Sequence, residues 1–396
     1  MGMRRIKYII DINEENKAGL YYSVLERVSR ANEDKVVYNL SFYDGKVISI
    51  FKNVFRIKPK KKKKNFSYKG MEITSLHIKR NIIDYVFILF GLSNIVRLLD
   101  AKRLAKNYKI NNSDVVFAHW GVSSGIIGYY LKKVIECKLI ICCHGSDVHS
   151  IPLKRNDIKK CLLKAFKYSD MNIFVSKALL NSARDLGYYG SNFSVIYNGV
   201  DEQYCNDISE QMVADFFSKY KISTCKSYLK IGFIGNLKSV KGADLLPQIT
   251  RAIIGQNKNT QFVIAGDGEL KDKIVRYCEN TSFIGHIDKH EVPVLLSGID
   301  ILILPSRNEG LPLIIAEAKK CGVSVVAADV GGVSELLEKE YCIPLGDSFV
   351  DEFSSKVVEV SNSLSGMVST GLDNRFLWSK IAQKELEIIT NVNNKI

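Results

Sequence analysis

The stretch that decides the fold is residues 300–337, which read DILILPSRNEGLPLIIAEAKKCGVSVVAADVGGVSELL. Two continuous apolar runs within it, Ile301–Leu304 and Val323–Ala327, are typical of parallel strands covered by helices on both faces. A short helix is predicted between them, and a Gly-Gly turn at Gly331 is expected to precede another helix. The pattern indicates a βαβα segment of an open α/β sheet, in which ligands bind beyond the carboxyl ends of the strands.

Two carboxylates mark that edge of the predicted sheet. Glu309 lies just before the short helix and Glu317 lies inside it. We expect Pro312 in the first helical turn, where its missing amide costs nothing, so that the free amides around Gly310 and Leu311 face an anion. A carboxylate would repel the anion at this site unless it binds a neutral group, such as the hydroxyl groups of a polyol. The pattern therefore indicates a ligand that has both a phosphate and a polyol, which is a nucleotide sugar. For either glutamate alone, a solvated acid at a helix end is the alternative.

The same segment resembles the signature of the family 4 retaining glycosyltransferases, also called group 1, which have the GT-B fold. In that signature two glutamates are separated by seven residues, as Glu309 and Glu317 are here, and the flanking PS, EGLPL and GGVSE elements are in register. The resemblance implies an α/β protein with two Rossmann-like doubly wound domains facing across a cleft. It also implies that Glu309 bonds the sugar hydroxyls and Glu317 the ribose hydroxyls.

Length and resemblance together predict the domain organisation. A chain of 396 residues is too long for one ordinary core, which favours two domains. We expect an acceptor-binding domain at 1–201, a linker at 202–227, a nucleotide-sugar-binding domain at 228–372, and a C-terminal helix at 373–396 that crosses back to the first domain.

The first domain carries the acceptor-side candidates. The strand Ile6–Ile10 is followed by Gly19, which is either a glycine of a donor-binding loop or part of a helix start. The predicted strand at 139–143 runs into a His-Gly-Ser-Asp turn. A lone histidine is usually structural, but the resemblance implies that His144 lies beside the transferred sugar and shapes the reaction centre. His119, at the end of an earlier strand, either belongs to the site or packs.

The second domain carries further donor-side candidates after its first strand, Leu229–Ile234. Lys241 is expected to neutralise the diphosphate as it leaves, with a solvated surface lysine as the alternative. The family pattern commonly has an arginine where this chain has Asn236, which offers one hydrogen bond in place of a second cation. His286 is expected to line the base pocket or to lie on a surface loop.

Charge and composition limit the partners. The net charge of +14 implies an acidic partner, but no nucleic-acid-binding motif is recognisable, so nucleic acid is not predicted. The lysine run Lys58–Lys64 is either a solvated loop or a contact with an anionic membrane surface, and we favour the membrane. Residues 82–99 are apolar enough to help, although such a segment is more often a buried helix.

Cellular context follows from the cysteines and the N-terminus. The nine cysteines have no metal-ligand spacing, so reduced thiols in a cytosolic protein are expected. The first residues predict a strand rather than a signal peptide, and no stretch reaches the length of a membrane-spanning helix. We expect a cytoplasmic enzyme, peripheral on the inner face of the plasma membrane.

The resemblance therefore implies a retaining glycosyltransferase that moves a sugar from a nucleotide sugar to a lipid-linked glycan in bacterial surface polysaccharide biosynthesis. No metal and no cofactor besides the donor are predicted, because the chain has no Asp-x-Asp pair at a strand end and protein cations would screen the phosphates. A GT-B sugar-nucleotide epimerase, a non-catalytic sugar-nucleotide-binding protein and a nucleic-acid binder are the alternatives.

Overall fold

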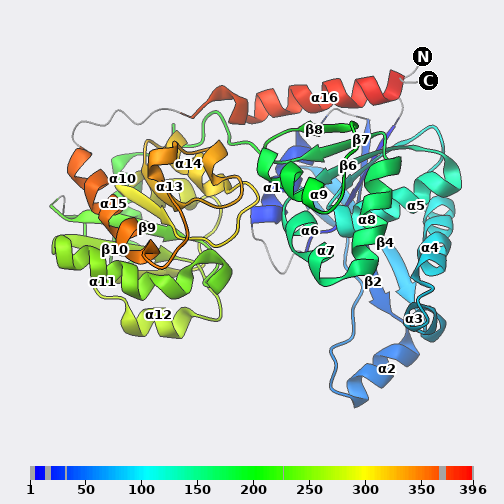
Figure 1. The fold of residues 1–396 in the computed structure, drawn as a ribbon, viewed down its shortest axis with the longest axis horizontal. Helices are drawn as coiled ribbons and strands as arrows, with labels where there is room; N and C mark the ends of the chain where they lie inside the picture. Colours follow the sequence, from blue (N-terminus) through cyan, green and yellow to red (C-terminus); the bar gives the residue numbers. More distant parts are fainter. Residues whose placement is uncertain (1–4, 14–18, 32–33, 226, 365–371, 395–396) are drawn as a thin grey trace. The chain divides into compact units, whose positions relative to one another are not determined.

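The computed structural model describes residues 5–13, 19–31, 34–225, 227–364 and 372–394. The chain forms two compact units (Figure 1). Unit 1 consists of residues Met1–Tyr197 together with Ile381–Ile396, and unit 2 consists of residues Asn198–Lys380. Each unit is built around one sheet of mainly parallel strands with buried, apolar residues.

The sheet of unit 1 has eight strands in the order β3-β4-β2-β1-β5-β6-β7-β8. All neighbours pair in parallel except β3 and β4. The strands are β1 (Ile6–Ile10), β2 (Lys35–Asp44), β3 (Phe66–Tyr68), β4 (Met71–Arg80), β5 (Val115–His119), β6 (Lys138–Cys143), β7 (Met171–Phe174) and β8 (Phe193–Val195). Because the chain moves outward from β1 in one direction and then from β5 in the other, the strand order reverses between β1 and β5.

The helices of unit 1 connect these strands or pack beside them. They are α1 (Gly19–Ser29), α2 (Lys46–Val54), α3 (Ile82–Leu89), α4 (Ser93–Asn107), α5 (Ile126–Ile135), α6 (Ser146–His149), α7 (Ile151–Lys154), α8 (Asn156–Tyr168), α9 (Lys177–Asp185) and, from Ile381 onward, α16 (Trp378–Asn394). Local chemistry sets some of their starts: the Ser176 side chain accepts a 3.0 Å hydrogen bond from the Leu179 amide and so caps α9.

The sheet of unit 2 has six parallel strands in the order β11-β10-β9-β12-β13-β14, so its order reverses between β9 and β12. The strands are β9 (Leu229–Ile234), β10 (Thr260–Ala265), β11 (Thr281–Gly285), β12 (Ile301–Leu304), β13 (Ser324–Ala328) and β14 (Cys342–Ile343). The helices are α10 (Glu210–Lys219), α11 (Leu246–Gln256), α12 (Lys271–Tyr277), α13 (Val292–Ser297), α14 (Leu313–Lys320) and α15 (Phe349–Ser363). One face of the sheet packs against α11 and α15 in a single apolar core that includes Phe233, Ile303 and Phe353.

Several expectations from the sequence need correction. The segment 82–99 is not one helix, because α3 ends at Leu89 and α4 starts at Ser93 after a turn with Gly91 at φ +75°. Pro312 is the N-cap of α14 rather than a residue of its first turn, and the Gly-Gly turn leads only to a single 3-10 turn, Val333–Glu335.

The cysteines and the helices bear on the expected cellular context. Cys205 and Cys321 form a disulfide with their Cα atoms 5.5 Å apart, so the expectation that all nine cysteines are reduced is wrong for this pair. Both belong to unit 2, where Cys321 directly follows α14. Among the described residues, none of the helices is long and apolar enough to cross a membrane.

Candidate functional site

The point at which strand order reverses in unit 2 holds the central pair of charges. β9 and β12 are neighbouring parallel strands, with Ile231 opposite Ile301, so the loops after both strands leave the same edge of the sheet. Lys241 lies in the first loop and Glu309 in the second, and the Lys241 Nζ lies 2.7 Å from Oε1 and 2.8 Å from Oε2 of Glu309. The structure therefore brings together two of the predicted site residues as an ion pair.

Neighbouring side chains hold this pair in place. The buried Ser306 hydroxyl donates a 2.8 Å hydrogen bond to Oε1 of Glu309. Arg307 donates from both terminal nitrogens to the Asp244 carboxylate, at 2.7 and 2.9 Å, and its backbone amide donates to the Val240 carbonyl. The loop after β12 is thus fastened to the loop after β9. Because Glu309 is almost fully buried and doubly hydrogen-bonded, its carboxylate is fixed in direction.

Two glycines allow the backbones at this edge to touch. Gly242 has φ +68°, and a Cβ atom there would overlap the carbonyl oxygen of Pro305. Gly331 has φ +55°, and a Cβ atom there would overlap the carbonyl oxygen of Glu309. Only glycine combines these conformations with such close approach, so the loops after β9, β12 and β13 depend on both residues.

The start of α14 offers amides beside the ion pair. In the part of the chain that the structure describes, the backbone amides of Gly310 and Leu311 have no acceptor within the protein. They lie immediately before a helix whose N-terminus favours negative charge. The arrangement suits an anionic group of a ligand.

Glu317 lies in a different neighbourhood from the ion pair. It is the fifth residue of α14, and it lies next to Tyr204 and Lys289. Burial raises the pKa of Glu317 above its ordinary value, while Lys289 opposes this shift. Burial and the Glu317 carboxylate together raise the pKa of Tyr204 well above its ordinary value. Nothing in the sequence connects Tyr204 with Glu317, because the two residues are far apart in the chain.

The remaining donor-side predictions occupy strand ends. Asn236 follows β9 and is exposed, and His286 follows β11 and is also exposed. Gly19 is the first residue of α1, and residues 14–18 before it lie outside the described part of the chain. Asn236 and His286 therefore share the carboxyl edge of the unit 2 sheet with Lys241 and Glu309, whereas Gly19 belongs to unit 1.

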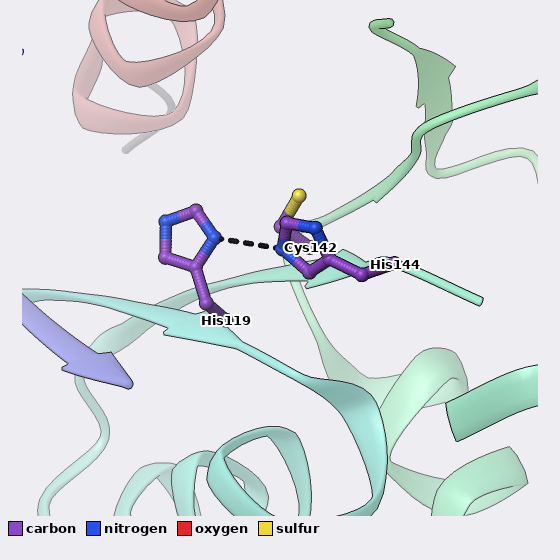
Figure 2. Close-up of side chains that lie close together, drawn as sticks. All are labelled: His119, Cys142 and His144. Carbon is purple, nitrogen blue, oxygen red and sulfur yellow. Dashed lines mark hydrogen bonds between the residues drawn. The ribbon is translucent and has the colours of Figure 1, made fainter. Parts of the chain in front are cut away.

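In unit 1, two histidines meet at the corresponding edge. His119 ends β5, and His144 directly follows β6. Figure 2 shows that their rings face each other, with His119 Nδ1 and His144 Nε2 3.1 Å apart and the Cys142 thiol beside them. His119 is fully buried and His144 is 8% exposed. His119, which the sequence left as either a site residue or a packing residue, is therefore a direct partner of His144.

The turn after β6 is built on Asp147. Its carboxylate accepts hydrogen bonds from the amides of Gly121 (2.8 Å), His144 (3.1 Å) and Gly145 (2.7 Å). Burial raises the pKa of Asp147, and the three amide donors oppose this shift. One acid thus joins the turn after β5 to the turn after β6 and fixes the backbone of His144.

Arg27 of α1 lies behind the histidines. It is fully buried, donates to the Cys142 Sγ at 3.0 Å and to the carbonyls of Ile196 and Tyr197, and lies 3.3 Å from the Glu385 carboxylate of α16. Sequence reasoning missed both members of this pair. The available signal was a single arginine among the apolar positions of the sequence that forms α1.

The buried setting keeps the histidines neutral. Burial, with a smaller effect of Arg27, lowers the pKa of His144 to about 3. Burial also lowers the pKa of His119 well below its ordinary value, and it raises the pKa of Cys142 to about 12. The pair can hydrogen-bond to a hydroxyl or to each other, but it carries no positive charge at neutral pH.

The ligand atoms of His119, Cys142 and His144 lie within 4.8 Å of one another, which would suit a metal ion by distance alone. However, Arg27 donates to the Cys142 sulfur, and its positive charge would lie next to the ion. The cluster therefore fits a hydrogen-bonded set of neutral groups better than a metal centre.

Solved structures share the fold of this chain. Anabaena HepE in complex with UDP and glucose matches with a TM-score of 0.71 at 16% identity, covering 98% of this chain and 99% of that one. Sucrose-phosphate synthase from Thermosynechococcus elongatus matches with a TM-score of 0.72 at 15% identity, covering 98% and 99%. The chain has the fold of these GT-B glycosyltransferases, as the sequence predicted.

The family is shown by two family models that together cover more than half of the chain. "Glycosyl transferases group 1" matches residues 229–363 and "Glycosyltransferase Family 4" matches residues 70–204. This chain therefore belongs to the family of group 1 or family 4 glycosyltransferases, and the predicted resemblance is confirmed.

Relatives come from several lineages. An uncharacterized glycosyltransferase of Methanocaldococcus jannaschii is 26% identical over 76% of this chain and 82% of its own. The N-acetyl-alpha-D-glucosaminyl L-malate synthase of Bacillus anthracis is 24% identical over 63% and 66%. An O-antigen biosynthesis glycosyltransferase of Escherichia coli is 23% identical over 66% and 74%.

Proposed function

We propose that this protein is a retaining glycosyltransferase that moves a sugar from a nucleotide sugar to a lipid-linked glycan. The observation that carries the proposal is the Lys241–Glu309 ion pair where the strand order of unit 2 reverses, beside the amides of Gly310 and Leu311. Ligands of open α/β sheets bind at this point, and the family membership makes the ligand a glycosyl donor. The solved HepE complexes with UDP and with UDP-glucose support a nucleotide sugar as donor.

Each donor-side residue has a role that its chemistry allows. Glu309, held by Ser306, would accept hydrogen bonds from sugar hydroxyls, which bring no charge repulsion. Lys241 is 31% exposed at its side chain, so it can also face the diphosphate, with the Gly310 and Leu311 amides as further donors. Glu317 would bond the ribose hydroxyls, Asn236 would donate one hydrogen bond to a phosphate, and His286 would lie against the base.

The transfer itself needs no covalent intermediate. The bond from the anomeric carbon to the phosphate oxygen breaks, the acceptor oxygen bonds to the same face of that carbon, and the acceptor proton passes to the leaving phosphate. Protein cations stabilise the developing charge, so we expect no metal requirement and no further cofactor. His144, neutral and backed by His119, would hydrogen-bond a sugar hydroxyl at the reaction centre.

The biological setting is proposed from the relatives. The Escherichia coli relative acts in O-antigen biosynthesis by its name, which supports a role in bacterial surface polysaccharide assembly with a lipid-linked acceptor. Such acceptors lie at the inner face of the plasma membrane. We therefore place the protein in the cytoplasm, bound peripherally to that face.

The test is thermal stabilisation by a panel of nucleotide sugars, followed by transfer to acceptors. A donor at about 100 times its dissociation constant should stabilise the protein by about 2.7 kcal/mol. Lys241→Ala should remove most of this stabilisation, because the diphosphate loses its cation, whereas Lys238→Ala, an exposed lysine of the same loop, should retain it. Equal stabilisation of both variants would contradict the assignment of Lys241.

The reaction products separate the alternatives. We expect the product to keep the donor's anomeric configuration, as read from its NMR coupling. We also expect a chelator to leave the rate of transfer unchanged. Donor consumption without acceptor would indicate an epimerase, binding without turnover would indicate a sensor, and strict dependence on manganese or an inverted product would overturn the mechanism.

A further inference from the structure

In helices α2 and α3 of unit 1, Lys52, Asp84 and Tyr85 face the protein, whereas Lys46 and Asn53 of α2 are exposed. The Lys52 Nζ lies 2.9 Å from the Asp44 carboxylate and 3.2 Å from the Tyr85 hydroxyl, which itself donates a 2.7 Å hydrogen bond to Asp44. Asp84, the first acid of α3, is 94% buried and bonds to the backbone amide of Asn81. The contacts of Lys52 and Tyr85 with each other and with Asp44 join α2 to α3.

Most apolar side chains of the same helices are exposed, although Ile48 of α2 is buried. On an ordinary surface helix the apolar face packs on the core, and the polar face meets water. Here Leu89 is 84% exposed, Phe90 78%, and Ile50, Phe51, Phe55 and Ile83 are each at least 60% exposed. Isolated exposed apolar residues are normal, but so many of them on two joined helices mark an interaction surface.

The rim of this surface is cationic. The segment Lys58–Lys64 is fastened along the end of β2, because the Lys60 amide donates to Asp44 and the Lys63 amide donates to the Ser41 hydroxyl. Lys63 also bonds to Asp11 at 2.8 Å, while Lys58, Lys60, Lys61, Lys62 and Lys64 remain exposed. Neither residues 46–64 nor residues 82–99 contain an acid other than the buried Asp84.

We propose that α2, α3 and the lysine segment form a docking surface for an anionic lipid bilayer, with both helices lying in the interfacial layer. Outward apolar side chains and a fixed row of cations are what such an interface binds. A second copy of this chain fits less well, since a symmetric contact would place two lysine segments against each other.

The position of the surface gives it a use. α2 follows β2 and α3 follows β4, so the surface lies off the carboxyl edge of the same sheet at which β5 and β6 present His119 and His144. Docking would hold that edge at the membrane, where a lipid-linked acceptor is presented. The inference rests on the peripheral membrane binding of the proposed function and names the surface responsible. Its test stands apart from the transferase assignment, because vesicle binding requires neither donor nor transfer.

The experiment measures sedimentation of the full chain with vesicles. The protein should bind phosphatidylglycerol–phosphatidylcholine vesicles, and the binding should fall with added salt and with pure phosphatidylcholine. The double variant Leu89→Ser, Phe90→Ser should bind at least about tenfold more weakly, because it removes two apolar side chains that the bilayer would bury. The variant with Lys60, Lys61, Lys62 and Lys64 all changed to Gln should lose the preference for phosphatidylglycerol.

The matched control is Leu153→Ser, which removes a leucine that is 70% exposed elsewhere in unit 1 and should bind as the unaltered protein does. Circular dichroism confirms that each variant is folded. Failure of the unaltered protein to bind, or equal binding of the Leu89 and Phe90 variant, would overturn the proposal. So would a dimer that this variant converts to monomer without any vesicle binding, since the surface would then be an interface between copies.

Discussion

At the ends of β5 and β6, His119 and His144 share one hydrogen bond in a buried setting. A histidine that the folded protein keeps neutral takes up a proton when the chain unfolds at a pH below the ordinary histidine pKa. Both histidines are of this kind, because burial lowers the pKa of each. Their contribution to stability is therefore present above the ordinary histidine pKa and is lost as the pH falls toward the folded value.

The pH dependence of unfolding tests this directly. Between pH 7 and pH 5 the unfolded chain gains about one proton at His144 that the folded chain does not, which should cost about 2 kcal/mol of unfolding free energy. In His144→Gln this part of the loss should disappear, as measured by urea denaturation at both pH values. The exposed His290→Gln should lose as much stability as the unaltered protein, and the same loss in both variants would show that His144 is protonated in the folded state.

Single residues show how far sequence reasoning reached. Lys241 and Glu309 come from separate stretches of the family pattern, yet nothing in the sequence says that they form an ion pair. Ser306 was noted only as part of a motif, and the roles of Arg307 and Asp244 as loop fasteners were not predicted. These contacts join residues more than sixty positions apart in some cases, so spacing along the chain carries no signal for them.

At the scale of elements, the loops at the carboxyl edge of unit 2 are set by backbone contact rather than by side chains. Gly242 and Gly331 both have positive φ, and both lie where a Cβ atom would overlap a carbonyl oxygen of the loop after β12. Gly322 also has positive φ, +75°, but it has open space around it. Substitution of the three glycines can therefore separate the free-energy cost of a positive φ from the cost of the overlap between a Cβ atom and a carbonyl oxygen.

Alanine substitution should therefore give unequal results. Gly322→Ala should cost about 1–2 kcal/mol, the usual penalty of a left-handed residue with a Cβ atom. Gly242→Ala and Gly331→Ala should each cost at least about 2 kcal/mol more, because the loops must move apart, and should weaken donor stabilisation. Denaturant titration with and without the best donor measures both effects. Equal costs at all three positions would mean that the loops are not held by close approach.

Elements were predictable where they had a buried, apolar pattern. Ile6–Ile10, Leu229–Ile234 and Ile301–Leu304 are strands at the expected residues, because fully covered parallel strands are continuous apolar runs. The long strands β2 and β4 were not predicted, since polar residues such as Asn39 and Ser75 are buried in them by hydrogen bonds. The exposure of the apolar side chains of α2 and α3 was not predicted either, because a pattern analysis cannot tell an apolar face on the core from one on the surface.

At the scale of the whole molecule, a buried ion pair connects the two ends of the chain. Arg27 belongs to α1 and Glu385 to α16, and both side chains are at most 5% exposed. Removal of one member of a buried pair leaves the other charge without compensation. The C-terminal helix is thus part of the core of unit 1 from Ile381 onward.

Glu385→Gln should accordingly lower the free energy of unfolding by about 3 kcal/mol, with the loss assigned to unit 1. Glu387→Gln, an exposed acid one half-turn further along α16, should change it by less than about 0.5 kcal/mol. Urea denaturation followed by tryptophan and circular dichroism signals measures both. If the two variants are equally stable, the pair contributes nothing to folding.

The return of α16 to unit 1 has a consequence for how the protein is made. A ribosome releases the chain from its first residue, and domains generally fold as they emerge. Here the residues of unit 1 up to Tyr197 emerge before the helix that supplies the counter-charge for Arg27, and the whole of unit 2 emerges between them. Unit 1 is therefore completed only after unit 2 has been synthesised in full, and a product terminated within unit 2 would contain an unfinished unit 1.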